Sequence, residues 1–232
     1  QRQMCIRDRY VYLKSTKSRS YSDEDVRSGK TYQYRVRCYW TIGGTNYYGN
    51  YSSVVSVTTP PAKVSSVNTA KKSSTYLTLS WKKVSGASGY RVYKYNTKTK
   101  AYEKVTTIAS GSTTSYKVTG LASATEYQFK VRAYKKAEDG NVWGSSSVVY
   151  KESTNPSKTK NLKLSTKSSA VTLSWSKVAR SSGYAVYRYD SKTKKYVRIA
   201  TVKSGKTVTY KDAKLKKGST KHYKVRAYKT YN

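Results

Sequence analysis

One set of short motifs recurs along this chain at a fixed spacing. Leu-Ser-Trp ends at Trp81 and again at Trp175, 94 residues later, and Ser-Gly-Tyr ends at Tyr90 and at Tyr184 with the same offset. Val-Arg-Ala-Tyr occupies 131–134 and 225–228, and a variant with cysteine in third place occupies 36–39. A fixed period with matching content indicates tandem copies of one module. A copy of about 95 residues can bury its own core, so the repetition disfavours a single buried catalytic site.

Within each copy the apolar residues alternate with polar ones. In the run 126–134 the odd-numbered residues are mainly apolar and the even-numbered ones mainly polar, which is typical of antiparallel strands with one wet face. No stretch carries apolar residues at helical spacing over three turns. Turn sequences separate the runs at 42–46, 96–100, 138–141 and 190–194. Short strands at regular spacing predict an all-β chain of two-sheet sandwiches.

Three motifs of the middle copy resemble the fibronectin type III domain: Trp81, Gly-Tyr-Arg-Val at 89–92, and the run 125–133. Their order and recurrence carry the resemblance over nearly the whole chain from Tyr10 on. It implies tandem immunoglobulin-like β-sandwiches, each with two antiparallel sheets. It also implies that Tyr127, preceded by Leu121, forms a tyrosine corner, with Tyr32 as its counterpart. Lys221 stands at this place in the third copy, and we expect its stem to cover the same apolar surface.

The prolines at 60–61 and 156 mark where one copy hands over to the next, because proline ends strands and stiffens short connections. We expect a partial domain at 10–59 with only the C-terminal strands, and with residues 10–13 on the fourth strand. A complete domain follows at 60–155, and a domain that lacks its last strand at 156–232. The sixth strand of that third copy would be an exposed edge. The chain is therefore interpreted as a fragment.

Residues 1–9 do not fit the repeat. Their sequence, Gln-Arg-Gln-Met-Cys-Ile-Arg-Asp-Arg, resembles translated sequencing-adaptor read-through. We interpret the segment as non-native and set it aside; the alternative is a genuine loop of the first copy.

The chain is strongly basic, with 47 Lys and Arg against 11 Asp and Glu and a net charge of +36. The net charge is +6 for residues 1–59, +11 for 60–155 and +19 for 156–232. No apolar run approaches the length of a membrane span, so we expect none. Cys38 stands where the other copies have alanine, and we expect it to be a small inward residue. Two cysteines provide no disulfide framework.

Catalytic motifs are missing from the sequence. The single histidine, His222, falls on the solvent side by parity and has no second ligand nearby. No Gly-x-Ser-x-Gly or glycine-rich phosphate loop occurs. The acidic cluster at 23–25 lies in a loop between two strands, and we interpret it as turn chemistry rather than a carboxylate site. We therefore expect no enzyme activity, no cofactor and no metal site.

Two sets of residues are predicted from strand parity. The structural core comprises Trp81, Tyr90, Val92, Leu121, Tyr127, Phe129, Val131, Trp175, Tyr184, Val186 and Val225. The outward face of the third and sixth strands comprises Arg91, Tyr93, Lys130, Arg132, Tyr134, Tyr187, Lys224, Arg226 and Tyr228. The outward set is favoured as cross-strand cation–π stabilisation. The alternative is a candidate polymer-binding face.

The resemblance implies a non-catalytic spacer and interaction segment of a larger exported bacterial protein, extracellular or at the cell surface. The alternative is weak binding of an anionic cell-wall polymer or polysaccharide through the basic, Tyr-rich face. The expected partners are that polymer and other domains of the parent protein. The charge permits nonspecific nucleic-acid binding, but no specific recognition motif is present.

Overall fold

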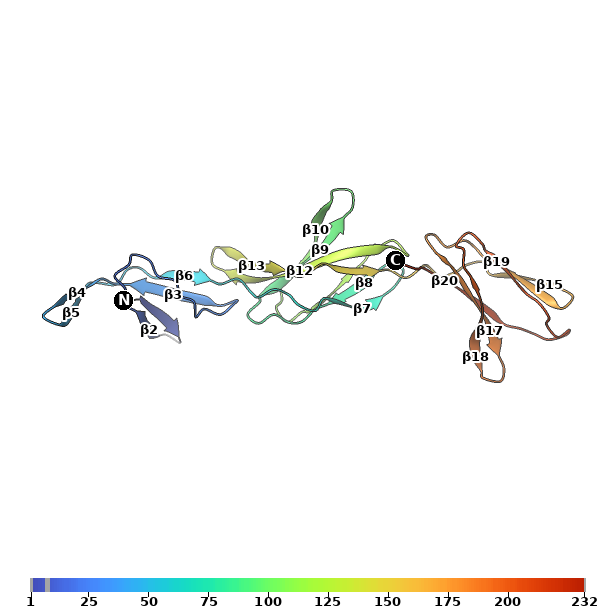
Figure 1. The fold of residues 1–232 in the computed structure, drawn as a ribbon, viewed down its shortest axis with the longest axis horizontal. Helices are drawn as coiled ribbons and strands as arrows, with labels where there is room; N and C mark the ends of the chain where they lie inside the picture. Colours follow the sequence, from blue (N-terminus) through green and yellow to red (C-terminus); the bar gives the residue numbers. More distant parts are fainter. Residues whose placement is uncertain (1, 7–8, 232) are drawn as a thin grey trace. The chain divides into compact units, whose positions relative to one another are not determined.

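The computed structural model describes residues 2–6 and 9–231, and within them every regular element is a β-strand (Figure 1). This confirms the expected all-β class of tandem immunoglobulin-like sandwiches. All strand pairings described are antiparallel. A search of the described residues finds no helix long and apolar enough to cross a membrane.

The middle copy contains two sheets. The smaller sheet has the order β11-β8-β7, formed by β7 (Asn68–Lys72), β8 (Leu77–Ser80) and β11 (Ser115–Val118). The larger has the order β10-β9-β12-β13, with β14 also on β12, and comprises β9 (Gly89–Asn96), β10 (Ala101–Ile108), β12 (Glu126–Ala137), β13 (Gly140–Ser146) and β14 (Tyr150–Ser153). Period-two alternation gives each sheet one buried face, as in a β-sandwich.

A Trp–Tyr pair marks the interior of the middle copy. The rings of Trp81 and Tyr90 meet edge to face with centroids 5.4 Å apart, a favoured aromatic geometry. The Tyr90 hydroxyl is buried with its ring, accepts the Val84 N–H at 2.9 Å and donates to the Gly111 carbonyl at 3.3 Å. A buried phenol is tolerated here because its polar end is satisfied.

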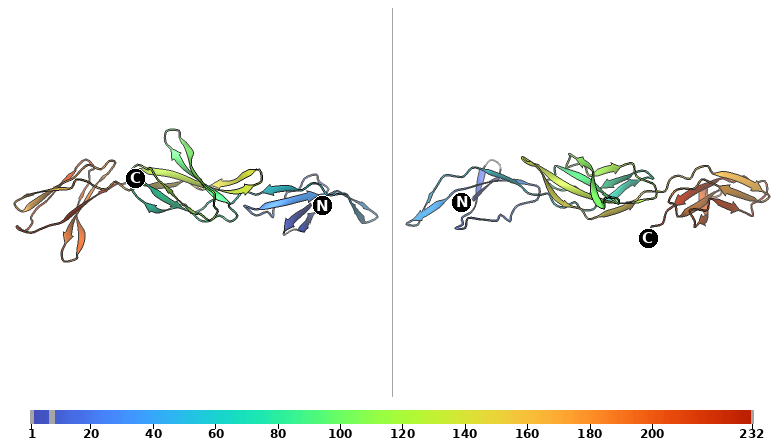
Figure 2. Two further views of the ribbon diagram at one scale, coloured as in Figure 1. Left: turned by 180° about the vertical axis from the view of Figure 1, so that it is seen from behind. Right: turned by 90° about the horizontal axis from the view of Figure 1, so that it is seen from above.

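The third copy repeats this interior. Its two sheets have the orders β15-β16-β19 and β18-β17-β20, formed by β15 (Lys163–Lys167), β16 (Ala170–Ser174), β17 (Gly183–Asp190), β18 (Lys195–Val202), β19 (Thr209–Asp212) and β20 (Tyr223–Tyr228). Trp175 and Tyr184 pack edge to face at 5.2 Å. The Tyr184 hydroxyl accepts the Val178 N–H at 2.9 Å and donates to the Gly205 carbonyl at 3.3 Å. Figure 2 shows both copies from two further sides.

The two sandwiches differ at one edge. Strand β12 is flanked by β9 and β13, whereas β20, among the described residues, pairs with β17 and ends its sheet. The burial of matching residues differs too: Val131 on β12 is fully buried, whereas Val225 on β20 is half-buried.

The first copy is a single sheet with the order β2-β1-β3-β6 and a separate β4-β5 hairpin. Its strands are β1 (Arg2–Ile6), β2 (Arg9–Lys14), β3 (Thr31–Val36), β4 (Tyr39–Ile42), β5 (Thr45–Tyr48) and β6 (Val55–Thr58). No second sheet covers these strands among the described residues, and Val55 is 62% exposed. Strand β2 pairs with β1 as β10 pairs with β9.

Part of the segment set aside from the sequence takes part in this sheet. Strand β1 pairs with both β2 and β3 and occupies the place that β9 has in the middle copy. The first copy therefore has one strand more than expected. Residues 1, 7 and 8 of the segment lie outside the described residues.

Cys38 is exposed, which corrects the prediction of a buried core residue. The parity argument assumed that one strand continues through it, as β12 does in the middle copy. Here β3 ends at Val36, a new hairpin starts at Tyr39, and Cys38 lies in the break. No sheet formed by the described residues faces Cys38, so its burial is lost together with the strand.

The tyrosine corner implied by the resemblance is present in two copies. The Tyr127 hydroxyl accepts the Ala122 N–H at 2.7 Å, and the Tyr32 hydroxyl accepts the Arg27 N–H at 2.7 Å. Each bond fixes the loop that leads into its strand. Lys221, at this place in the third copy, is half-buried, and a lysine cannot accept such a bond.

Candidate functional site

Most residues of the core set lie in the interior. Those buried are Trp81, Tyr90, Val92, Leu121, Phe129, Val131, Trp175, Tyr184 and Val186. Tyr127 and Val225 are half-buried.

The outward face of the middle copy brings its predicted cations together on adjacent strands. Lys130 lies opposite Tyr93 and Arg132 lies opposite Arg91 in the β12–β9 register. All four side chains are partly exposed. Strand pairing therefore brings these four residues together on neighbouring strands.

Tyr134 does not belong to that face as an accessible residue. It is only 6% exposed, because its ring covers Gly89 on the neighbouring strand. A Cβ at Gly89 would come within 2.6 Å of the Tyr134 hydroxyl. Tyr228 covers Gly183 in the same way and is half-buried. The alternation puts these two rings on the outer side of the sheet. Because glycine has no side chain, each ring can lie flat against the sheet, which reduces its exposure.

The arginines of the middle face are engaged within the protein. The Arg91 guanidinium lies 4.1 Å from the centroid of the Trp143 ring, and its Nε donates to the Thr107 hydroxyl at 3.1 Å. Arg132 lies 5.5 Å from the same ring and donates from Nε to the Gly144 carbonyl. These contacts attach β13 to β9 and β12. The geometry supports the cross-strand interpretation for this pair of arginines.

A tyrosine–lysine cluster repeats in the two sandwiches. Tyr95 and Tyr102 lie 5.2 Å apart, and the Lys130 ammonium is 4.3 Å from the Tyr102 ring. In the third copy Tyr189 and Tyr196 lie 5.4 Å apart, and Lys224 is 3.9 Å from the Tyr196 ring. The face predicted from sequence omitted these four tyrosines. The 94-residue spacing of Tyr102 and Tyr196 could have identified them.

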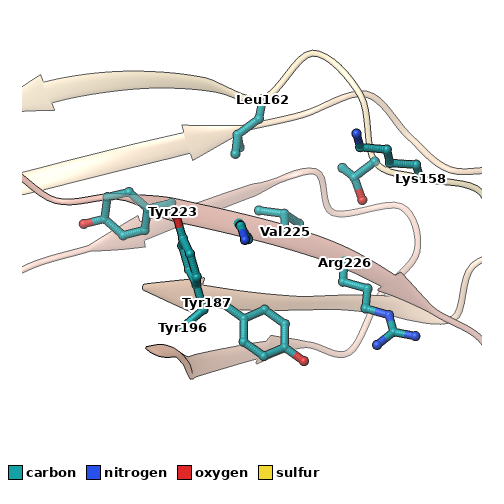
Figure 3. Close-up of a pocket in the computed structure, with 9 residues that line it drawn as sticks. Lys158, Leu162, Tyr187, Tyr196, Tyr223, Val225 and Arg226 are labelled. Atoms are coloured by element: carbon teal, nitrogen blue, oxygen red, sulfur yellow. The ribbon is translucent and has the colours of Figure 1, made fainter. Parts of the chain in front are cut away.

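In the third copy, part of the predicted face lines a groove of about 630 Å³ (Figure 3). Its lining is Lys158, Thr159, Leu162, Tyr187, Tyr196, Tyr223, Lys224, Val225 and Arg226. The lining has three cations and no carboxylate. The Thr159 hydroxyl is buried and has no hydrogen-bond partner among the described residues. The groove lies along β20, the strand with a free edge, so it can accept an anionic or hydrogen-bonding group.

The acidic residues serve the fold. The Asp23 carboxylate accepts the Tyr34 hydroxyl at 2.7 Å and the Asp25 N–H at 3.2 Å. This agrees with the turn interpretation of the cluster at 23–25. The described residues contain no group of three or more His, Cys, Asp or Glu that could hold a metal ion. His222 is exposed and meets the edge of Tyr189 with centroids 6.2 Å apart.

Comparisons with known proteins found several similar chains. Exoglucanase B of Cellulomonas fimi is 27% identical, and the match covers 94% of this chain but 21% of that protein. The chain thus spans about a fifth of its relative's length.

Two solved structures are among the matches. The FN1–FN3 domains of chicken CNTN1 are 22% identical, with 88% of this chain and 74% of that one covered and a TM-score of 0.38. A two-domain fibronectin type III segment from chicken tenascin is 21% identical, with coverages of 74% and 92% and a TM-score of 0.46.

The family model of the fibronectin type III domain matches residues 60–149, which lie in the middle copy. That part of the chain is therefore similar to the fibronectin type III family.

Proposed function

We propose that the chain is a non-catalytic spacer and presentation segment of a larger exported bacterial protein. The observation that carries this proposal is the repeated interior: the middle and third copies each close over their own Trp–Tyr pair with the same hydrogen bonds. Modules that fold separately and follow one another through short junctions hold neighbouring domains apart without needing a ligand. The proline residues at 60–61 and 156 limit bending at those junctions.

The relative supports the setting. The chain aligns along almost its full length with a fifth of a bacterial exoglucanase, so a segment of this kind occurs beside other parts in one polypeptide. The proposal includes an extracellular location and a bacterial origin for this chain.

Small-angle X-ray scattering of the full chain tests the spacer proposal. We expect an elongated particle whose maximum dimension stays constant from low to moderate salt, because stiff junctions rather than charge repulsion keep the copies apart. A compact particle, or one that collapses when salt screens its charge, would contradict the proposal.

A second candidate function is weak binding of an anionic polysaccharide. It is favoured by the +19 charge of residues 156–232 and by the carboxylate-free lining of the groove. Retention of the chain on an acidic but not a neutral polysaccharide, lost as salt rises, is the expected result. Equal retention on both polymers would exclude it.

A further inference from the structure

Two hairpins of this chain are built to the same plan. In the β9–β10 turn the Asn96 side-chain oxygen accepts the Lys98 N–H at 2.9 Å; in the β17–β18 turn the Asp190 carboxylate accepts the Lys192 N–H at 3.0 Å. Thr99 and Thr193 tie each turn to a carboxylate, at Glu103 and Asp190. These bonds define each turn's backbone. Both hairpins extend beyond the rest of their sheets (Figure 1).

Each turn presents two exposed lysines, Lys98 and Lys100 in the middle copy and Lys192 and Lys194 in the third. We call each pair a hairpin tip. Lys100 and Lys194 have φ of 52° and 53°, a left-handed conformation that favours glycine or asparagine. The two turns therefore share the same backbone conformation at their second lysine.

The four tip lysines form no ion pair within the described part of the chain. The acidic groups nearest in sequence are occupied by the turns themselves. The hydrogen bond from the Lys192 N–H, and to a smaller extent the one from the Thr193 hydroxyl, holds the pKa of Asp190 below its usual value. The tip cations are therefore available to an external anion.

The tyrosines next to each turn, Tyr102 and Tyr196, indicate what kind of anion fits. Single-stranded nucleic acids bind by stacking bases on open aromatic faces. Here the Lys130 and Lys224 ammonium groups each lie over one face of Tyr102 and Tyr196, at 4.3 and 3.9 Å. A base stacking on that face would have to displace the cation, whereas a carboxylated sugar can contact the cation where it lies.

We propose that the two hairpin tips are paired contacts for one flexible acidic polysaccharide with a carboxylate on most of its sugars. This inference deepens the second candidate function and rests on it. Two weak contacts joined by one polymer strand bind far more tightly than either alone, because the second contact forms at a high effective concentration. Repetition of the module thus supplies the two tips that bivalent binding needs.

The test uses the full chain with polygalacturonate long enough to span both tips and with a short oligogalacturonate that reaches only one. The variants are K98Q/K100Q, K192Q/K194Q and the fourfold combination. The matched control is K216Q/K217Q, which removes the same charge from an exposed loop of the third copy. Circular dichroism verifies the fold of each variant.

For the long polymer, we expect either tip variant to weaken binding about a hundredfold. The control should change the affinity less than about twofold, because diffuse charge acts only at longer range. For the short oligomer, a single-tip variant should lose only about half the sites, since the other tip still binds. The fourfold variant should bind neither the long polymer nor the short oligomer.

Three outcomes overturn the inference. If the control weakens binding as much as a tip variant does, diffuse charge binds the polymer; the inference fails and the second candidate stands. If the unaltered chain does not bind polygalacturonate even at low salt, the second candidate fails as well. Tighter binding of duplex DNA than of polygalacturonate at equal charge and salt would assign the tips to a nucleic acid.

Discussion

The Tyr223 hydroxyl donates a hydrogen bond to the Asp212 carboxylate at 2.8 Å, and the two residues lie eleven positions apart. The first copy has the same pair at the same separation, with Tyr34 and Asp23 at 2.7 Å. The matching positions of the middle copy hold Phe129 and Val118, both buried. The repeat thus carries two alternative pairs at one place, one hydrogen-bonded and one apolar.

This exchange predicts strong coupling between Asp212 and Tyr223. D212V alone strands a buried hydroxyl and also removes the Arg188 partner, which lies 2.9 Å from the carboxylate. We expect it to destabilise the third copy by about 2–4 kcal/mol. D212V/Y223F installs the apolar pair of the middle copy and should recover about half of that loss. Peptide-resolved hydrogen exchange of the full chain measures both.

Independent, additive effects of D212V and Y223F would contradict the pairing. V118D serves as the reciprocal change, because it places a carboxylate beside Phe129, which offers no donor. It should destabilise the middle copy and leave the third copy unchanged.

The same bond predicts a pH dependence at the alkaline end. Burial, together with the Asp212 hydrogen bond, raises the pKa of Tyr223 from 10.0 to about 12. The folded state therefore holds its proton at pH values where the unfolded state loses it. The stability that this proton provides is complete below pH 10.0 and is lost as the pH rises to about 12.

Y223F is the comparison for this prediction, because it removes the titrating group and keeps the ring. Exchange protection of the third copy should fall less steeply between pH 10 and 12 in Y223F than in the unaltered chain. Identical slopes would show that the hydroxyl is not held by Asp212 in solution.

Two glycines are predicted to be intolerant of any side chain. A Cβ at Gly89 or Gly183 would collide with a carbonyl of the neighbouring strand and with the tyrosine that covers the glycine. We expect G89A and G183A each to cost about 1–3 kcal/mol in their own copy.

G120A provides the control for these variants. A Cβ there meets nothing within 4 Å, although φ is +70°. It should cost no more than about 1 kcal/mol, from backbone strain alone. Thermal unfolding monitored with exchange by peptide separates the copies, and equal costs for all three variants would argue against the collision.

The repeat and the alternation of apolar residues predicted most of the architecture, because a sheet with one buried face imposes period two on its sequence. The inward positions of Trp81, Tyr90 and Trp175 follow from it directly. The alternation tells on which side of the sheet a residue lies, but not how deeply a side chain on the outer face is buried. Tyr134 is buried on that side only because Gly89 lies opposite, a cross-strand relation that no local pattern contains.

Cys38 shows the second limit. Its place in the repeat matches Ala133 and Ala227, but the strand that should carry it is interrupted and no sheet covers it. Burial depends on partners elsewhere in the chain. The tyrosines of the tyrosine–lysine clusters recur at the 94-residue spacing, so the sequence contains a signal for them. Their contact with each other follows only from the registers of β9 with β10 and of β17 with β18.

Amide hydrogen exchange of W175A, resolved by peptide, tests most directly whether the copies are separate modules. Removing a buried tryptophan should cost the third copy about 3–5 kcal/mol, enough to abolish protection across residues 163–228. Protection of residues 68–153 should stay at the level of the unaltered chain. Loss of protection in both copies together would contradict the modular account on which the proposed spacer function depends.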